Sequence, residues 1–563
     1  MPEVSYAHGT SDQALIGTAI GEFFHRIVAA HPAREALVDR PKGVRLTYAA
    51  LGEQTDRLAR ALMALGVQSG ERVGIWAPNR WEWVVTQFGT PKLGSVLVNV
   101  NPSYRLRELG FALRQSGIRT LITAPGFGRS DYLAMLEDLV PSLARGRVAA
   151  EEFPQLQEIV VLSDAAPPGM MTWSALLARA DEVSDAALRE REASVQFDDA
   201  VNIQYTSGTT GMPKGATLSH HNLLNNGYFI GELMRFTPED RLCIPVPFYH
   251  TFGMVLANLA CMTHGATMVI PGEGFSAGDV LATVEAERCT ALHGVPTMFI
   301  AELQHPDFER YDLSSLRTGL MAGSPCPVEV MKQVQTKMHM SEVEIAYGMT
   351  ETSPVSTQTR ADDPLELRVS TVGRVHPHVE VKIADPATGA VVPRGEPGEL
   401  LTRSYAVMLG YWENPGATAE AIDAARWMHT GDLAVMREDG YLNIVGRIKD
   451  MIIRGGENIY PREIEEFYYT HPKVADIQVI GVPDHKYGEQ VMAWIRLRPG
   501  ETATAEEMQE FARGQIAHFK IPHYVKFVDE FPMTVTGKVQ KYVMRDVAVK
   551  ELGLGAAAGE QMA

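Results

Sequence analysis

The sequence reads Tyr205-Thr206-Ser207-Gly208-Thr209-Thr210-Gly211-Met212-Pro213-Lys214-Gly215 at the point that decides its fold. An expected strand at 202–205 precedes this loop, and an expected helix at 219–236 follows it. Glycines let backbone N–H groups converge, hydroxyls add donors and the lysine adds a positive charge, which suits a polyphosphate. The loop is not a Walker A motif, because Pro213 stands where that motif requires glycine. A plain flexible turn is the alternative interpretation.

Outward from this loop, short apolar runs alternate with amphipathic segments between residues 45 and 345. The pattern predicts a strand at 72–77, a helix at 106–116 and a strand at 120–124. Strands alternating with helices of this length are typical of a layered α/β fold with largely parallel sheets.

The sequence pattern changes further along the chain, where turn-forming residues become frequent. We expect a β-rich subdomain at about 369–445, followed by a compact strand–helix mixture the size of an independent α+β domain. The predicted organisation is a large N-terminal domain at 1–449 and a smaller C-terminal domain at 450–563, with the boundary at Lys449–Asp450.

The net negative charge of the chain disfavours binding to polyanions. The chain has 51 Lys and Arg residues against 69 Asp and Glu residues, and its net charge is −18. We therefore expect no binding to nucleic acid or to anionic membrane surfaces. The longest apolar stretch, residues 254–270, is interrupted by polar residues, so no integral membrane association is expected.

Cysteine usage and the N-terminus indicate a cytoplasmic protein. The N-terminus carries acidic residues and lacks the basic and apolar runs of a signal peptide. The cysteines form no CxxC pair, so we expect reduced core residues rather than a disulfide framework. They are Cys243, Cys261, Cys289 and Cys326.

Further motifs follow the glycine-rich loop in a fixed order. They are Pro247-Phe248-Tyr249-His250-Thr251-Phe252-Gly253, Ala322-Gly323-Ser324-Pro325, Tyr347-Gly348-Met349-Thr350-Glu351, Thr430-Gly431-Asp432, Gly446-Arg447-Ile448-Lys449-Asp450 and Thr536-Gly537-Lys538. With the loop, they resemble the signature blocks of the AMP-binding, or adenylate-forming, superfamily. The resemblance covers residues 45–545 and is strongest to its acyl-CoA synthetase branch, in particular to bacterial medium-chain fatty-acyl-CoA ligases.

The resemblance implies a reaction in two steps. A carboxylic acid attacks the α-phosphate of ATP to give an acyl-adenylate and pyrophosphate, and coenzyme A then displaces AMP. Both steps require charge neutralisation and alignment more than covalent help from the protein. The implied cofactors are ATP, Mg²⁺ and coenzyme A.

The family's roles for the phosphate-binding residues are carried over residue by residue. Thr350 would contact the α-phosphate, and Glu351 and Thr206 would bind Mg²⁺, which neutralises the departing pyrophosphate. The loop residues implied to hold the other phosphates are Thr206, Ser207, Gly208, Thr209, Thr210, Gly211 and Lys214.

The resemblance also implies how the nucleoside is held. The Tyr347 ring and the backbone of Gly323, Ser324 and Pro325 would enclose adenine. The Asp432 carboxylate suits a pair of ribose hydroxyls, and Arg447 would support the same sugar.

Three features of the C-terminal part are implied to serve the two steps. Lys538 would reach the α-phosphate and the substrate carboxylate during adenylation. Family members rotate the C-terminal domain at the position of Asp450 between the half-reactions. In the second pose the loop Arg454-Gly455-Gly456 would replace Lys538, and Gly456 would leave room for the pantetheine arm of coenzyme A.

Two residues that are missing from this sequence narrow the class of acid substrate. Amino-acid-activating relatives carry an aspartate in the segment that reads 248–251 here, and acetate-activating relatives carry a tryptophan where Gly348 and Met349 stand. A medium-chain fatty acid is expected, with an aryl acid as the alternative. His250 would lie near the carboxylate. The residues expected either to line an apolar slot or to pack as core are Phe252, Met254, Val255 and Val295.

Other classes of function are weighed against this one. Residues 271–278 satisfy both a dinucleotide fingerprint and a GxSxG pattern, with a strand and a helix flanking them, but lack the accompanying motifs of an oxidoreductase or hydrolase. A non-catalytic family member, a luciferase or a peptide-synthetase adenylation domain are further alternatives. The His220-His221 and His376-His378 pairs are interpreted as solvated loop or cap residues rather than metal ligands. A homodimer is expected from the family alone.

Overall fold

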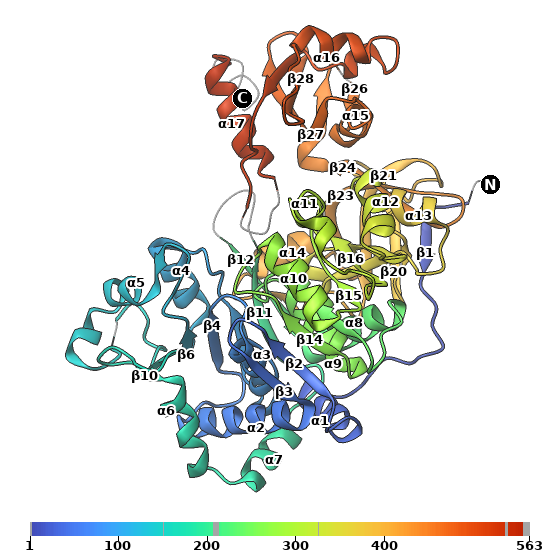
Figure 1. Cartoon of the computed structure of the whole chain (residues 1–563). Coiled ribbons are helices and arrows are strands. Elements are labelled where there is room, and N and C mark those ends of the chain that lie inside the picture. Colours follow the sequence, from blue (N-terminus) through green and yellow to red (C-terminus); the bar gives the residue numbers. More distant parts are fainter. Residues whose placement is uncertain are drawn as a thin grey trace. The chain divides into compact units, whose positions relative to one another are not determined.

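The computed structural model describes residues 3–149, 151–206, 213–324, 326–455, 457–534 and 539–554 (Figure 1). The chain divides into two compact units. The larger unit comprises His8–Val381 and Thr402–Met428, and the smaller unit comprises Met1–Ala7, Lys382–Leu401 and His429–Ala563. The predicted boundary at Lys449–Asp450 lies within the smaller unit and stays a prediction.

The first sheet of the larger unit has eight strands, of which the first six in its order run parallel. The last two pair antiparallel and form the edge that carries the ends of the glycine-rich loop. In spatial order the strands are β10 (Met171–Thr172), β9 (Glu158–Val161), β6 (Ile118–Thr123), β4 (Arg72–Trp76), β5 (Val96–Asn99), β11 (Ala200–Thr206), β12 (Lys214–Ser219) and β22 (Gly410–Tyr411).

The second sheet of the larger unit has nine strands, with a parallel centre and antiparallel edges. In spatial order the strands are β19 (Arg374–Val375), β18 (Val355–Gln358), β17 (Glu342–Gly348), β16 (Thr318–Ala322), β15 (Ala291–Leu292), β13 (Arg241–Cys243), β14 (Thr267–Ile270), β2 (Glu35–Asp39) and β3 (Val44–Thr47). The layered α/β architecture predicted from the alternation of strands and helices is confirmed.

Helices cover these sheets, and α2 packs against β2, β3 and α3 (Figure 1). The principal helices of the larger unit are α1 (Ile20–Ala30), α2 (Tyr48–Ala64), α3 (Trp81–Gly89), α4 (Leu106–Ser116), α5 (Tyr132–Leu139), α6 (Trp173–Ala178), α7 (Asp185–Ala193), α8 (His220–Leu233), α9 (Ala260–His264), α10 (Ala277–Glu287), α11 (Pro296–Leu303), α12 (Val328–Lys337), α13 (Leu365–Ser370) and α14 (Pro415–Ala421). A π-helix, η4 (Phe252–Leu259), precedes α9.

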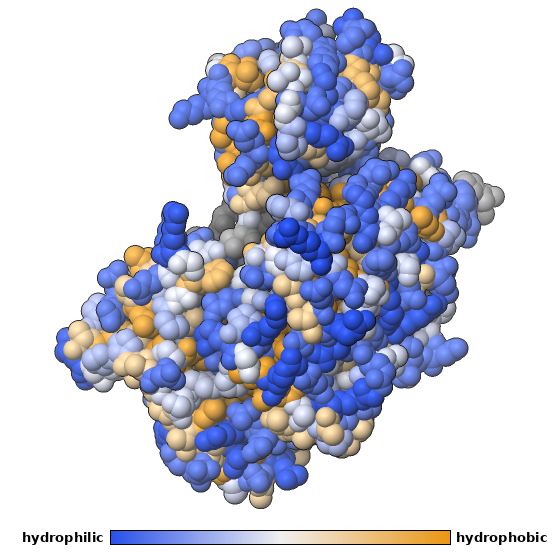
Figure 2. Space-filling model, in the orientation of Figure 1, coloured by the Kyte–Doolittle hydropathy of each residue, from blue (hydrophilic) through white to orange (hydrophobic). Residues whose placement is uncertain are grey.

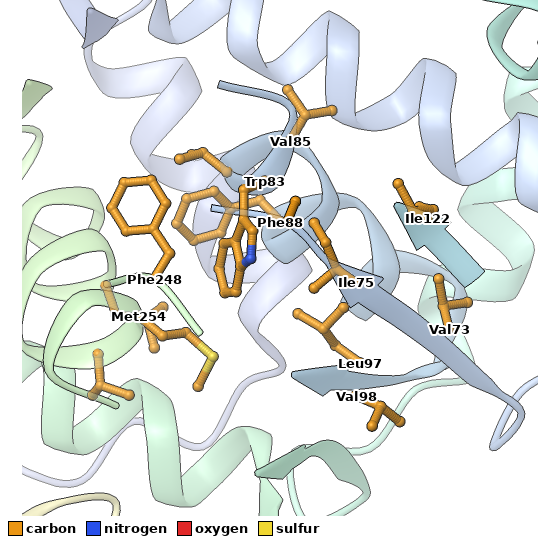
Figure 3. Packing of buried hydrophobic residues seen from close by; sticks show 14 of the residues in the cluster. Val73, Ile75, Trp83, Val85, Phe88, Leu97, Val98, Ile122, Phe248 and Met254 are labelled. Atoms are coloured by element: carbon orange, nitrogen blue, oxygen red, sulfur yellow. The ribbon is translucent and has the colours of Figure 1, made fainter. Parts of the chain in front are cut away.

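Helix α3 lies in the core of the larger unit, because all of its residues except Trp81 are buried. Figure 3 shows Ile75 and Leu97 of the eight-stranded sheet on one side of the Trp83 ring of this helix. On the other side, the Trp83 ring lies 5.5 Å from the ring of Phe248, centroid to centroid. Phe248 follows a strand of the nine-stranded sheet, so α3 joins the two sheets through one hydrophobic core.

Two further sheets of five strands each have most or all of their residues in the smaller unit. Its helices are α15 (Pro461–Tyr468), α16 (Ala505–Ala512) and α17 (Lys541–Glu551). The first sheet has the order β1 (Tyr6–His8), β20 (Val379–Ala384), β21 (Pro397–Ser404), β23 (Met428–Met436) and β24 (Leu442–Arg447). The second has the order β26 (Glu457–Ile459), β25 (Ile452–Arg454), β28 (Gly488–Leu497) and β27 (Val474–Asp484), with β29 (Tyr524–Phe527) paired to β28.

Surface and core polarity agree with the sequence analysis. Hydrophilic residues dominate the face in Figure 2, with hydrophobic residues scattered between them. The four cysteines are buried and form no disulfide bond, as predicted. Over the ranges that the structure describes, no helix is both long and apolar enough to cross a bilayer.

The structure corrects two expectations. The glycine-rich loop does not lead directly into a helix, because β12 follows it and pairs antiparallel with β11 before α8 begins. His220 and His376 are not solvated but fully buried. The Nδ1 of His220 accepts a hydrogen bond from the backbone N–H of Ile20 at 3.1 Å, and burial lowers the pKa of this imidazole to about 3.

A buried carboxyl in the nine-stranded sheet gives a prediction about stability. Glu344 on β17 is fully buried, and its Oε2 accepts a hydrogen bond from the Gln358 amide at 2.8 Å. Burial raises the pKa of Glu344 from 4.5 to about 8. Between these values the folded chain holds a proton that the unfolded chain releases, so the free energy of unfolding falls as the pH rises through this window.

Glu344→Gln should remove this pH-dependent contribution. The midpoint of urea unfolding, measured at about pH 5.5 and about pH 8, should therefore fall less in the variant than in the wild type. An equal fall in both proteins would contradict a protonated Glu344.

Candidate active site

The two ends of the glycine-rich loop face each other at the edge of the eight-stranded sheet. Thr206 ends β11, Lys214 begins β12, and the two residues are direct partners in the antiparallel ladder. The Thr206 hydroxyl donates to the backbone carbonyl of Lys214 at 3.3 Å. The predicted phosphate-binding residues 207–211 lie outside the described residues. The strand pairing fixes where this loop starts and ends.

The turn after β17 holds Thr350 and Glu351, which are both buried. It forms a short 3₁₀ helix, η6 (Thr350–Thr352), and the Thr352 hydroxyl donates to the carbonyl of Pro354 at 2.7 Å. The carbonyl of Glu351 accepts from the backbone N–H of Met408 at 2.9 Å. These hydrogen bonds fix the backbone from which the Glu351 side chain extends.

Tyr411 contacts both Lys214 and Glu351, the residues predicted to bind phosphate and metal. Its hydroxyl donates to Oε1 of Glu351 at 2.7 Å, and the Nζ of Lys214 lies 5.1 Å from the centroid of its ring. Burial and the neighbouring charge of Glu351 raise the pKa of Tyr411, so its hydroxyl stays protonated and donates. The sequence analysis missed Tyr411, because a tyrosine before a tryptophan carries no chemical motif.

The residues expected to enclose adenine come from adjacent parallel strands. Gly323 and Ser324 follow β16, Tyr347 lies near the end of β17, and Ala322 is the ladder partner of Ala346. Gly323 has a φ of 90°, a left-handed conformation that favours glycine. The carboxyl ends of such strands are where open α/β sheets bind ligands. Pro325 lies outside the described residues.

His250 lies in the segment between β13 and the π-helix η4. Its Nδ1 accepts from the backbone N–H of Phe252 at 3.2 Å, which places the proton of a neutral imidazole on Nε2. The four residues weighed between lining and packing are all buried in the main hydrophobic cluster of the larger unit. Of these, Met254 also lines a small pocket with Leu97, Asn202 and Leu223.

Asp432 and Arg447 form a pair in the smaller unit. They are ladder partners on β23 and β24, and Arg447 Nε lies 2.8 Å from Asp432 Oδ1. The backbone N–H of Asp432 donates to the Thr430 hydroxyl at 3.1 Å. The pairing holds a buried carboxylate beside a guanidinium on rigid strands.

Arg454 ends β25 in the same unit, and Gly455 follows the strand. Arg454 Nε donates to Gln490 Oε1 at 2.7 Å, and its guanidinium carbon lies 4.2 Å from the Tyr487 ring centroid. Gly455 has a φ of 61°, and an added Cβ would lie 3.3 Å from the Tyr487 ring. Two other predicted residues, Gly456 and Lys538, lie outside the described residues.

Glu351 is the described carboxylate expected to bind Mg²⁺. Within the described ranges, no group of three or more His, Cys, Asp or Glu side chains is arranged to hold a metal ion. Mg²⁺ in nucleotide sites is usually held by one or two carboxylates together with substrate phosphates. Glu351 fits this role, because Tyr411 occupies only its Oε1 and no other described residue bonds its side chain.

Comparisons with known proteins extend over both units. The profile of the AMP-binding enzyme family matches residues 24–412, and that of the AMP-binding enzyme C-terminal domain matches residues 463–538. The chain is 50% identical to the putative acyl-CoA synthetase YngI of Bacillus subtilis (strain 168), over 96% of this chain and 99% of that protein. It is 40% identical to the human mitochondrial medium-chain acyl-CoA ligase ACSF2, over 98% of this chain and 91% of that protein.

The chain is also similar to solved structures of ligases. The anthranilate CoA ligase AuaEII in complex with anthranoyl-AMP has a TM-score of 0.85 and 27% identity, covering 96% of this chain and 99% of that one. ATP-bound MatB from Rhodopseudomonas palustris has a TM-score of 0.80 and 30% identity, covering 94% and 99%.

The close approach at Gly348 gives a prediction about the Glu351 turn. An added Cβ at Gly348 would lie 1.7 Å from the carbonyl oxygen of Pro354, whereas one at Gly416 in α14 would meet nothing within 4 Å. Gly348→Ala should therefore destabilise the larger unit by about 3 kcal/mol and lower its melting temperature. The matched Gly416→Ala change should leave the melting temperature unchanged or raise it. Equal melting of Gly348→Ala and the wild type would show that the turn is not tightly constrained.

Proposed function

The chain belongs to the AMP-binding enzyme family, and from this premise we propose that it joins a medium-chain fatty acid to coenzyme A in two steps that use ATP. The reaction class is that of an AMP-forming acid–thiol ligase of the acyl-CoA synthetase type. The family uses ATP, Mg²⁺ and coenzyme A, in agreement with the sequence analysis. The observation that carries the proposal for this chain is the meeting of Lys214 and Glu351 at Tyr411.

In the first step the carboxylate of the acid attacks the α-phosphate of ATP, and pyrophosphate departs. Lys214 and the loop before it neutralise the β- and γ-phosphates, and Thr350 contacts the α-phosphate. Glu351 and Thr206 would hold Mg²⁺, which would neutralise the charge of the leaving group. Lys538 approaches the α-phosphate and the substrate carboxylate together, because two anions repel unless a cation lies between them.

The proposal assigns the base and the ribose of the nucleoside to different residues. Adenine lies against Tyr347 and the backbone at 323–325. The ribose hydroxyls bond the Asp432 carboxylate, which Arg447 already orients at 2.8 Å. The fixed orientation of this carboxylate supports its role, because a preorganised acceptor loses little conformational entropy on binding.

In the second step the thiol of coenzyme A attacks the acyl-adenylate and AMP departs. Arg454, Gly455 and Gly456 line the approach of the pantetheine arm. The left-handed backbone at Gly455 and its tight approach to Tyr487 support a requirement for glycine at this position. His250 lies beside the substrate carboxylate.

A medium-chain fatty acid is the proposed substrate class. Residues 248–251 contain no aspartate to pair with a substrate amine, and Gly348 and Met349 replace the tryptophan expected for acetate. ACSF2, at 40% identity, is by name a medium-chain acyl-CoA ligase. A cytoplasmic location and a homodimer belong to the same proposal and rest on the sequence analysis alone.

The substrate class is tested by measuring pyrophosphate release with Mg-ATP, coenzyme A and acids from acetate through medium-chain, long-chain and aryl acids. Release should depend on the acid and be fastest with a medium-chain acid. The thioester should form in the same reactions. A maximum with an aryl acid would replace the proposed substrate, and release without thioester would contradict coenzyme A as the acceptor.

Lys538→Ala provides the matched variant in the same assay. It should lose most pyrophosphate release yet still convert preformed acyl-adenylate to the thioester, because its proposed role is confined to the first step. An equal loss in both steps would contradict that role.

A further inference from the structure

Two opposite charges lie against a single tyrosine at the edge of the sheet. Lys214 Nζ lies 5.1 Å from the centroid of the Tyr411 ring, and the hydroxyl of the same ring bonds Glu351 Oε1 at 2.7 Å. Among the residues that the structure describes, Lys214 makes no ion pair and Glu351 bonds no cation. One tyrosine therefore contacts an ammonium over the face of its ring and a carboxylate at its hydroxyl.

A direct ion pair between these groups would work against anion binding. An ion pair with Glu351 would neutralise the Lys214 ammonium, and this pair would have to break before Lys214 could bind a phosphate. Glu351 would in turn be neutralised before a divalent cation reached it. Unlike charges that share a partly buried site attract strongly when no group separates them.

The backbone on either side holds the tyrosine in this place. Tyr411 is the ladder partner of Ala216 on β12, and the N–H of Trp412 donates to the carbonyl of Gly215 at 2.7 Å. The N–H of Met408 donates to the carbonyl of Glu351 at 2.9 Å. One short segment is thus bonded both to the strand that carries Lys214 and to the turn that carries Glu351.

We propose that Tyr411 is a positioning residue that keeps Lys214 and Glu351 from pairing with each other. Its ring separates the two charges, and its hydroxyl fixes one carboxylate oxygen so that the other faces away from it. Lys214 then remains available to phosphate and Glu351 to the metal. This inference rests on the proposed function, since it concerns the same ATP site.

Two substitutions separate the ring from the hydroxyl. Tyr411→Phe keeps the spacer and should bind ATP without metal as the wild type does, but should bind Mn²⁺ about tenfold more weakly in the presence of ATP. Tyr411→Ala removes the spacer, so metal-free ATP binding should also weaken by about tenfold. Calorimetry measures ATP binding, and electron paramagnetic resonance measures bound Mn²⁺.

A double variant distinguishes the spacer from a general structural role. In Tyr411→Ala with Glu351→Gln, Lys214 has no carboxylate to pair with, so metal-free ATP affinity should return toward that of the wild type. Loss of packing alone would not be repaired by this change. Tyr48→Phe is the matched control, because it removes a buried hydroxyl that bonds the Ala266 carbonyl at the same 2.7 Å and should change neither affinity.

The proposal is overturned if the double variant binds ATP no better than Tyr411→Ala, or if Tyr411→Phe binds Mn²⁺ as the wild type does. Wild-type ATP binding and pyrophosphate release test the proposed function separately. If the wild type fails to bind ATP, the proposed function and this inference both fail.

Discussion

The antiparallel pairing of β12 with β11 on one side and β22 on the other is the constraint on which the site depends. Through β11, which pairs in parallel with β5, the start of the phosphate loop is tied to the core of the larger unit. Through β22, Tyr411 is brought beside Lys214 and Glu351. Because β12 is paired on both sides, the sheet sets the positions of these charges.

The chain handles anions although its own net charge is −18. In the proposed function it does so with single cations held by specific neighbours, Lys214 over Tyr411, Arg447 beside Asp432 and Arg454 over Tyr487. Each contact orients a cation without burying it in a large basic patch. Such an arrangement binds a phosphorylated small molecule locally while the overall field repels polyanions.

Much of the fold followed from periodicity. The strand at 72–77 and the helix at 106–116 match β4 and α4, because their apolar spacing is strong and local. In β12, Lys214–Ser219, apolar and polar residues alternate only over the last four positions, which is too short a run to mark a strand between two others. Burial of His220 depends on Ile20, two hundred positions away, and β22 has only two residues. Such features arise from tertiary packing, which a local pattern does not encode.

The central claim, that this chain adenylates a carboxylic acid, is tested most directly by the fate of the carboxylate oxygen. The enzyme would be incubated with ATP, Mg²⁺, coenzyme A and octanoate labelled with ¹⁸O in its carboxylate, and the phosphate products analysed by mass spectrometry. Attack on the α-phosphate predicts one labelled oxygen in AMP and none in pyrophosphate. Label in orthophosphate, with ADP as the nucleotide product, would contradict adenylation.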